Sequence, residues 1–305
     1  MNSSYFIISL DFELFWGVRD VLTIGSYGKN ILGSRNAVPK ILHAFKSYEI
    51  SATWAIVGLA SFSSRAELLK NLPDILPDYT NRELNPYPHI KKIGSNENDD
   101  PYHFGYSIVR QIQDTPRMEI ASHTFSHFYC LEENCNQGAF QSDLNASLRA
   151  FNRFGLEPKS IIFPRNQYDN LHLREAYSCG FRAYRGNEIG SIYAPRSMQN
   201  TTTLQRCGRL LDSYIDITGQ NCFHVKRDNE LMINVPASRF LRPTGLGVLE
   251  WLRLRRITNA MTYAAVTGSG FHLWWHPHNF GINTDANITF LHSILKHYCL
   301  LREKY

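Results

Sequence analysis

Two acidic residues, Asp11 and Glu13, stand directly behind an apolar run near the start of the chain, in the stretch SLDFELFWG. Side chains two positions apart on a β-strand point to the same face, so both carboxylates project together if the strand continues this far. Two carboxylates held together away from water need a cation, a proton or an arginine beside them. The pair therefore indicates either a charged site or a strand end that runs into solvent.

A pair of histidines, His123 and His127, lies in the stretch SHTFSH. On one helical turn, imidazoles four positions apart share a face and can chelate one metal ion. The chain has 12 histidines, so such a spacing is expected somewhere by accident. The histidine pair is informative because of its position: the stretch begins where the strand-like segment MEIAS ends. Active sites of α/β folds lie at the carboxyl ends of the strands.

Two further strand-like segments end in polar residues. FPRNQY brings Arg165, which we predict to pair with Asp11 and to keep it ionised and oriented. FHLWWHPHNFG ends in His276 and His278, and a histidine at this place can deliver a proton near neutral pH. For His272, inside that segment, packing in the core is the favoured interpretation. Four strand ends with different polar groups favour one shared site.

Strand-like and helix-like segments alternate along most of the chain. The predicted strands are 5–10, 52–58, 118–122, 160–163, 181–185, 231–235 and 271–275. The predicted helices are 36–48, 141–154, 171–180, 246–265 and 285–301. This order is typical of parallel strands with helices packed outside them, in an open sheet or a barrel.

The chain of 305 residues contains no obvious linker or internal repeat, so we predict one domain over 1–305. A hydrophobic fraction of 43% is typical of a globular protein with a real core. Two insertions rich in polar residues and proline are expected at about 61–117 and 191–228. Because long connections in α/β folds usually run over the functional end of the sheet, we interpret the first as a lid or substrate wall.

The net charge of +5 is too small and too scattered to predict a nucleic-acid partner. The most basic run, LRLRR at 252–256, lies in a segment with helical spacing, so we expect a solvated helix face. A patch for a lipid-linked or phosphorylated substrate is the alternative.

Six cysteines without CxxC spacing are expected to be free thiols. The sequence has no run of about 18 apolar residues, the length expected of a transmembrane segment. Its first residues also lack the pattern of a secretory signal. We therefore expect a cytoplasmic protein.

Taken together, these stretches resemble the motifs of the polysaccharide deacetylase superfamily, carbohydrate esterase family 4, also described as the nodulation-type deacetylase domain. SLDFE resembles its acidic motif, SHTFSH its metal motif, PRNQY its arginine-bearing motif and WWHPH its final histidine motif, in the family's order. ATWAIVG resembles its second core strand. The resemblance implies an α/β fold, a distorted (β/α)7 TIM-like barrel. It also implies hydrolysis of an N-acyl group, acetyl or formyl, on an amino sugar or glycan intermediate.

Carried over to this chain, the resemblance makes Asp11 the general base and Arg165 the residue that orients it. His123 and His127 become ligands of one divalent metal ion, most often zinc. His276 becomes the acid that protonates the leaving amine. The backbone N–H of Tyr168 is expected to help bind the oxyanion.

This sequence departs from the family at two motifs. The usual acidic motif has two adjacent aspartates, whereas here Phe12 separates Asp11 from Glu13, so the missing metal ligand must come from Glu13. Two rival interpretations stay open: Asp11 as the ligand with Glu13 as base, or no metal at all. The third motif has Asn166 and Gln167 in place of the usual proline, which leaves the oxyanion assignment open.

Aromatic side chains offer flat surfaces for a sugar ring, with ordinary core packing as the alternative for each: Trp16, Trp54, Phe125, Trp274 and Trp275. The expected substrate is an N-acylated sugar, a sugar nucleotide or a lipid-linked glycan, used in the assembly of a surface polysaccharide such as O-antigen or capsule. Two other classes of function remain: a metal-free amidase on a small non-sugar amide, and a non-catalytic glycan-binding barrel.

Overall fold

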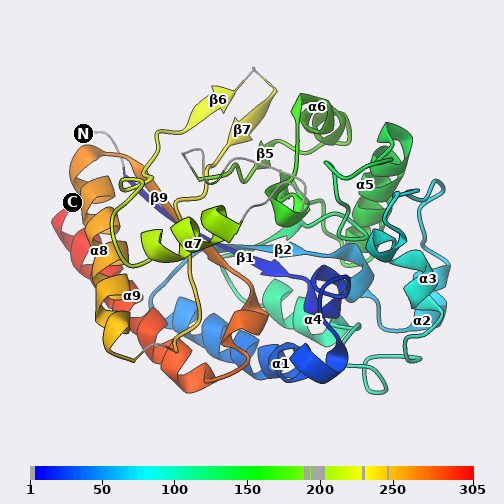
Figure 1. The fold of residues 1–305 in the computed structure, drawn as a ribbon, viewed down its shortest axis with the longest axis horizontal. Coiled ribbons are helices and arrows are strands. Elements are labelled where there is room, and N and C mark those ends of the chain that lie inside the picture. The colour runs from blue at the N-terminus through cyan, green and yellow to red at the C-terminus, as the bar shows by residue number, and fades with distance from the viewer. Residues whose placement is uncertain (1–3, 189–192, 194–202, 229–230, 246) are drawn as a thin grey trace.

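The computed structural model describes residues 4–188, 193, 203–228, 231–245 and 247–305. The described strands form one sheet in the order β6-β7-β5-β4-β3-β2-β1-β9-β8 (Figure 1). Their bounds are β1 Tyr5–Phe12, β2 Ala52–Ile56, β3 Met118–Ser122, β4 Ser160–Ile161, β5 Ala183–Tyr184, β6 Lys226–Asp228, β7 Met232–Asn234, β8 Arg239–Phe240 and β9 Gly270–Trp275.

Every neighbouring pair of strands is parallel except β6 and β7. The sheet curls, and the segment between β7 and β8 spans its two ends. Val235 N–H and Ala237 N–H donate to the carbonyls of Tyr184 and Gly186, next to β5, and Ser238 N–H donates to His272 of β9. Eight parallel strands therefore make a curled half-barrel, which confirms the predicted distorted barrel.

Helices cover the outside of the sheet. Their bounds are α1 Ile24–Ser47, α2 Arg65–Leu69, α3 Tyr87–Ile90, α4 Tyr106–Gln113, α5 Gln137–Asn152, α6 Asn170–Ser178, α7 Thr203–Asp212, α8 Glu250–Thr267 and α9 Thr284–Lys304. In Figure 1, α8 and α9 lie on one side of the sheet, and α5 and α6 lie at the opposite end. None of the described helices combines the length and apolar character needed to cross a membrane.

Strand β1 shows how the sheet separates core from site. Leu10 and Phe12 are buried in the main hydrophobic core. Ser9 and Asp11 alternate with them and point to the other face, where the Ser9 hydroxyl contacts His272 Nε2 at 2.8 Å. The same alternation therefore buries one face of the strand and directs Asp11 toward the inside of the curled sheet.

Helix α1 begins at Ile24, twelve residues before the predicted start at 36. The Thr23 side chain caps it by accepting from Ser26 N–H. Glycines near its start weaken the helical pattern in the sequence, but one of them has a packing role. A Cβ at Gly33 would overlap the backbone carbonyl of Gly281, so only glycine lets α1 approach the short helix η8 (Pro277–Phe280). This approach positions the segment that follows β9.

The two predicted insertions have different outcomes. The insertion at 61–117 contains α2, α3 and α4 and packs on the turn η1 (Leu14–Gly17), where Phe15 N–H donates to the Tyr102 carbonyl at 3.0 Å. It therefore covers the turn directly after Glu13. The insertion at 191–228 lies partly outside the described residues, and its described part includes α7 and β6.

The expectation of a solvated basic face at 252–256 is wrong. Arg253 and Arg256 of α8 are buried. Arg253 pairs with Glu250 at 2.5 Å, and Arg256 pairs with Asp216 at 3.0 Å. Two of the arginines in this run thus hold α8 to its surroundings.

Candidate active site

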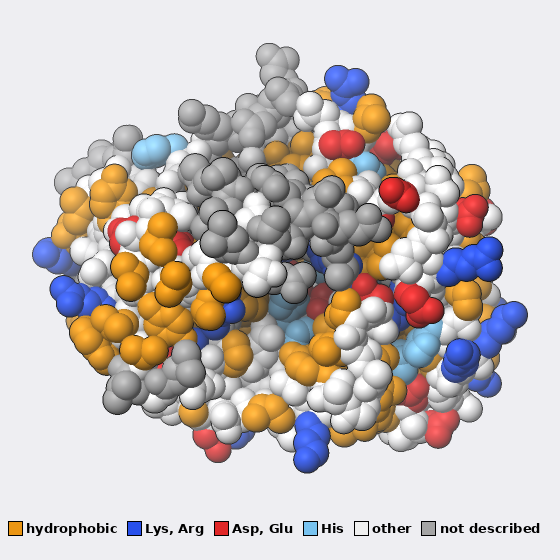
Figure 2. Space-filling view, in the orientation of Figure 1, with side chains coloured by type: hydrophobic (Ala, Val, Ile, Leu, Met, Phe, Trp, Pro, Cys, Tyr) orange, Lys and Arg blue, Asp and Glu red, His pale blue; other side chains and the backbone are white. Residues whose placement is uncertain are grey.

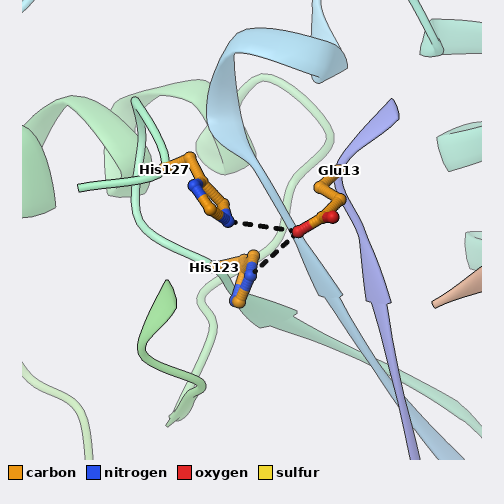
Figure 3. Close-up of side chains that lie close together, drawn as sticks. All are labelled: Glu13, His123 and His127. Atoms are coloured by element: carbon orange, nitrogen blue, oxygen red, sulfur yellow. Dashed lines mark ion pairs between the residues drawn. The ribbon is translucent and has the colours of Figure 1, made fainter. Parts of the chain in front are cut away.

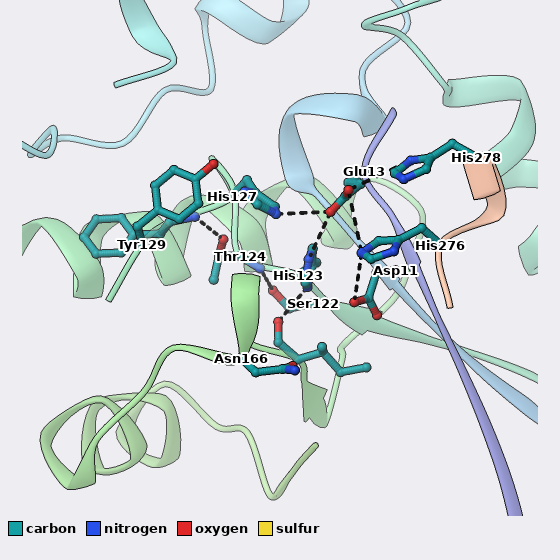
Figure 4. A network of polar contacts seen from close by, with 12 residues as sticks. Asp11, Glu13, Ser122, His123, Thr124, His127, Tyr129, Asn166, His276 and His278 are labelled. Carbon is teal, nitrogen blue, oxygen red and sulfur yellow. Dashed lines mark hydrogen bonds and ion pairs between the residues drawn. The ribbon is translucent and has the colours of Figure 1, made fainter. Parts of the chain in front are cut away.

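Polar residues from four strand ends meet at one edge of the sheet. Asp11 lies near the end of β1, and the others follow β1, β3, β5 and β9: Glu13, His123, His127, Arg185, His276 and His278. Figure 4 shows most of them around one point, and Figure 2 shows histidine and acidic side chains in a hollow near the centre of the molecular face. The predicted meeting of the acidic pair with the imidazole pair is therefore confirmed.

Glu13, His123 and His127 form the centre of this site (Figure 3). One Glu13 oxygen lies 3.1 Å from His127 Nε2 and 3.5 Å from His123 Nε2. All three residues are buried, and their potential ligand atoms lie within 4.8 Å of one another. One carboxylate and two imidazoles are a ligand set that zinc accepts, with a coordination position left for water or substrate.

The imidazole of His123 is oriented for such a role. Its Nδ1 lies 2.8 Å from the carbonyl oxygen of Ile162 and donates a proton to it. The other nitrogen, Nε2, then carries the lone pair that faces Glu13. A backbone acceptor behind a ligating imidazole is the usual way in which proteins fix ring orientation and tautomer.

The stretch from His123 to His127, directly after β3, is a loop, and the expectation of a helical turn is wrong. Thr124 and His127 have left-handed backbones, with φ of 61° and 60°. The loop nevertheless brings the two imidazole rings to a centroid separation of 5.1 Å. The shared position of the two rings thus comes from a folded loop that α5 supports.

Asp143 of α5 supplies that support. Its carboxylate accepts from Phe125 N–H at 2.7 Å, from Ser126 N–H at 3.1 Å and from the Ser126 hydroxyl. Complete burial raises the pKa of Asp143 to about 7, although these hydrogen bonds lower it. No sequence motif marks Asp143, because most of its partners are backbone groups of a loop that lies 17 and 18 residues away in the chain.

The stretch SLDFELFWG ends in Gly17, where the structure requires a glycine. A Cβ on this residue would fall inside the carboxyl group of Glu13. The turn η1 folds back over Glu13, so glycine is needed for the carboxylate to occupy its place beside the imidazoles. This is a second site residue that the sequence analysis did not identify.

Asp11 is held by Arg185, which corrects the prediction for Arg165. The two terminal nitrogens of Arg185 donate to the two Asp11 oxygens at 2.8 and 2.7 Å. Arg185 directly follows β5, so it stands at a strand end like the other site residues. Arg165 follows β4 and pairs instead with Asp20 at 2.5 Å.

His276 lies between the two acids (Figure 4). Its Nε2 is 3.7 Å from Asp11 and 3.8 Å from Glu13, and its side chain is 22% exposed. His278 is buried and stacks on His276, with ring centroids 4.9 Å apart and planes inclined by 5°. His276 thus faces both acids, although β1 ends at Phe12 and Glu13 stands at the start of the turn η1.

The charges in the site suit a divalent cation. Burial raises the pKa of Glu13, but the neighbouring histidines, His276 first, outweigh it and hold this pKa well below its usual value. Burial likewise raises the pKa of Asp11, and Arg185 is the main group that lowers it below its usual value. Burial lowers the pKa of His127 to about 4. At neutral pH the site therefore offers an anionic carboxylate and an unprotonated imidazole at His127, as metal binding requires.

Four of the five aromatic residues predicted to offer surfaces for a sugar are core residues. Each is 0% exposed, so the prediction of a sugar-binding surface is wrong for Trp16, Trp54, Phe125 and Trp275. In contrast, Trp274 is partly exposed and faces the site: its ring lies 4.1 Å from the Arg185 guanidinium carbon and 5.6 Å from the ring of His276. Trp274 therefore offers the aromatic wall.

Tyr168 packs its ring against Phe163 and Tyr184, with centroids 5.2 and 5.3 Å apart. Asn166, two residues before it, accepts a hydrogen bond from Arg185 at 3.1 Å. The segment after β4 thus reaches the Asp11–Arg185 pair through Asn166, while the predicted oxyanion role of the Tyr168 backbone stays a prediction.

Comparisons with known proteins agree with this fold. Three solved structures cover 96% of this chain, each with a TM-score of 0.56. They are a protein from Mycobacterium smegmatis described as a polysaccharide deacetylase (11% identical, 85% of that chain), one from Pseudomonas aeruginosa PAO1 with the same description (10%, 84%) and the Puue allantoinase (10%, 83%). At these identities they show a shared fold. Among curated proteins, the comparison finds no match.

A family model described as polysaccharide deacetylase matches residues 30–184, just over half of the 305 residues. The match includes the histidine pair and its loop, while Asp11, Glu13 and His276 join the site through the fold. This chain belongs to the polysaccharide deacetylase family.

Proposed function

We propose that the protein is a metal-dependent hydrolase that removes an N-acyl group, acetyl or formyl, from an amino sugar or glycan intermediate. The observation that carries the proposal is a buried carboxylate, Glu13, in contact with two imidazole nitrogens and next to a second buried carboxylate, Asp11, held by an arginine. A non-catalytic glycan-binding barrel needs neither the ligand set nor an oriented second acid.

Glu13, His123 and His127 would hold the metal ion, with zinc as the best match to one carboxylate and two imidazoles. An ion held there would polarise the acyl carbonyl and lower the pKa of a water molecule. The chain contributes the geometry: the Ile162 carbonyl fixes the tautomer of His123, Asp143 holds the loop that carries both histidines, and Gly17 leaves room for the Glu13 carboxylate.

Asp11 is proposed to be the general base. Arg185 binds both of its oxygens, keeps it ionised and fixes its orientation, so that it can accept a proton from the attacking water. The distances favour Asp11 as the base and Glu13 as the ligand over the reverse assignment. Glu13, and not Asp11, lies within 3.5 Å of the Nε2 atoms of both His123 and His127.

His276 is proposed to donate the proton that the leaving amine needs. It faces both acids and is the more exposed member of the stacked histidine pair, so a substrate can reach it. The backbone N–H of Tyr168 is proposed to assist in binding the oxyanion.

The substrate is proposed to be an N-acylated sugar, a sugar nucleotide or a lipid-linked glycan used in surface-polysaccharide assembly such as O-antigen or capsule. We further propose that the enzyme works in the cytoplasm. All six cysteines are free thiols, which suits a reducing compartment.

The test is amine release from a panel of N-acetyl and N-formyl sugars, sugar nucleotides and lipid-linked sugars, with protein loaded with zinc. We expect release from at least one member, abolition by a chelator and restoration by added zinc. Asp11→Asn should remove turnover while it retains bound metal, and His123→Ala should remove the metal.

Two outcomes would contradict the proposal. Amine release that survives complete removal of metal would point to a metal-free amidase. Absence of release from every sugar, together with tight glycan binding, would point to a non-catalytic barrel.

A further inference from the structure

A second cluster of metal-ligating side chains lies away from the active site, between the loop before α5 and the start of α6. Helices α5 and α6 pack side by side at this end of the molecule (Figure 1). Between them and the loop is a cavity of about 310 Å³. Its lining includes two thiols, an imidazole and three carboxylates: Cys130, Cys135, His172, Glu132, Asp169 and Glu175.

The imidazole in this cavity is fixed in one tautomer. His172 Nδ1 donates to the Asp169 carboxylate at 2.7 Å, and Asp169 is itself held as the N-cap of α6 by the backbone N–H groups of Leu171 and His172. The lone pair is therefore on Nε2, which faces Cys135 Sγ at 3.9 Å. The His172 ring packs edge-on against Phe140, with centroids 5.0 Å apart.

These two donor atoms are almost at the spacing that one ion requires. Typical zinc bonds of about 2.3 Å to sulfur and about 2.0 Å to nitrogen place the two ligand atoms roughly 3.6 Å apart at a tetrahedral angle. A carboxylate on the far nitrogen of the imidazole is also the common support of a ligating histidine.

The charges around Cys135 distinguish a cation site from a nucleophile. Burial, Asp169 and Asp143 raise the pKa of the Cys135 thiol to about 12, so it carries no charge of its own at neutral pH. Carboxylates oppose an anion on the sulfur but attract a cation. One of them, Glu175, has an oxygen, Oε2, that is buried and has no hydrogen-bond partner among the described residues.

We propose that Cys135 and His172 bind a second, thiophilic divalent cation of the zinc class. Among the described residues no third His, Cys, Asp or Glu ligand atom lies within 4.8 Å of both, so water and carboxylates that move in from the cavity wall would complete the coordination. On binding, the Cys135 S–H proton leaves to solvent and the sulfur forms a bond to the ion, without any change of oxidation state. The ion would tie the loop before α5 to α6, and α5 carries Asp143, which supports the ligand loop of the active site.

Cobalt(II) provides the test, because a thiolate ligand gives Co²⁺ a near-ultraviolet charge-transfer band that carboxylate and imidazole ligands do not. Titration of the full chain with Co²⁺ should produce this band, saturating at one ion per chain, and Zn²⁺ should remove it by competition. Cys135→Ser should abolish the band and His172→Gln should weaken Co²⁺ binding at least tenfold. Cys179→Ser is the matched control, since its partly buried thiol faces the Asn145 amide oxygen at 3.9 Å.

A second measurement keeps the test independent of the active site. In a Glu13→Gln background, Zn²⁺ should raise the thermal midpoint, and adding Cys135→Ser should remove this rise, with far-ultraviolet circular dichroism confirming that each variant is folded. Absence of the band up to millimolar Co²⁺, or a band that persists in folded Cys135→Ser, would overturn the proposal. A band lost in Cys130→Ser but retained in Cys135→Ser would overturn the choice of thiol.

Discussion

Arg185 and Arg165 follow two neighbouring strands, β5 and β4, and each pairs with an aspartate from the N-terminal segment. In the first pair, Arg185 and Asp11 are 2% and 3% exposed, and Asp11 also lies 3.7 Å from His276. In the second pair, Arg165 is 20% exposed and Asp20 2%. The two pairs have the same chemistry but different neighbours.

Each arginine also stacks on an aromatic ring. Arg185 lies over Trp274, which faces the site, and Arg165 lies over Tyr129, whose ring packs edge-on against His127 at 5.1 Å. Tyr129 in turn donates to Asp20 at 3.2 Å. The first pair therefore lies in the proposed reacting region, whereas the second supports the wall behind His127, a proposed metal ligand. An arginine–aspartate pair in this fold acquires its role from what surrounds it.

The largest expected difference between the pairs is in turnover. Arg185→Ala leaves Asp11 buried and misoriented, so we expect kcat to fall by roughly 10²–10⁴-fold, the range of a general base, and stability to fall by about 3–5 kcal/mol. Arg165→Ala should lower kcat by less than about tenfold, because Asp11 keeps its partner. The measurements are amine release and urea unfolding of both variants.

The pH profile checks that the loss acts through Asp11. Arg185 is the main group that lowers the pKa of Asp11 against burial, so without it this pKa rises. The base is then protonated over a wider acidic range, and the acid limb of kcat/KM moves to higher pH in folded Arg185→Ala or Arg185→Lys, but not in Arg165→Ala. Equal losses and equal profiles in the two variants would break the comparison.

Arg185 occupies the place beside Asp11 that was predicted for Arg165, which shows how much of the site the sequence can predict. The predicted strand ends were sufficient to group Asp11, Glu13, the histidine pair and His276, which the structure places together. They could not distinguish Arg165 from Arg185, because β4 and β5 both end at the same edge of the sheet. Arg165 has a left-handed backbone, with φ of 53°, and its pairing with Asp20 depends on where that local turn directs the side chain.

Trp54 shows a similar limit in predicting which face of the sheet a side chain lies on. Trp54 lies on β2, where it is the register partner of Leu10, while Ala55 is the partner of Asp11. Trp54 therefore shares the core-facing side of the sheet with Leu10, opposite to Asp11. Period-two alternation was visible in the sequence, but the pairing register that relates one strand to the next was not. Residues that act through backbone contacts, such as Asp143, carried no motif at all.

Gly17 extends the comparison to the other acid of the pair. Gly17→Ala places a methyl group in the space of the Glu13 carboxylate, so we expect zinc affinity to fall by at least about 10–100-fold, the usual cost of disturbing the support of a ligand. The measurement is zinc competition against a chromophoric chelator. Gly25→Ala in α1 is the control, since its nearest neighbour would be 3.7 Å away and its zinc affinity should not change.

Asp143 supports the loop that carries His123 and His127 without contacting either histidine in the described hydrogen bonds. Asp143→Asn should weaken zinc binding by about tenfold, since the amide loses one acceptor for this loop.

The raised pKa of Asp143 also determines how its contribution to stability changes with pH. A carboxyl whose pKa rises on folding stabilises the protein below its ordinary pKa of 3.8, and this contribution is lost as pH rises to about 7. The stability difference between the natural chain and Asp143→Asn, measured by urea unfolding with chelator present, should therefore fall between pH 5 and pH 8. A constant difference would contradict the titration of Asp143, and Asn145→Ala is the control on the exposed side of α5.

The smallest expected effects concern the two rings stacked on the arginines. Trp274→Ala should raise KM about 3- to 10-fold with little change in kcat, because an aromatic face in contact with a ligand contributes about 0.5–1.5 kcal/mol. Tyr129→Phe removes the hydrogen bond to Asp20 but keeps the ring beside His127, so it should cost about 1 kcal/mol of stability and leave KM unchanged. Steady-state kinetics and urea unfolding of the same two preparations separate these outcomes. If Tyr129→Phe raised KM as much as Trp274→Ala, the second pair would also belong to the substrate-binding surface, and the division between a pair that touches substrate and a pair that supports the wall would be wrong.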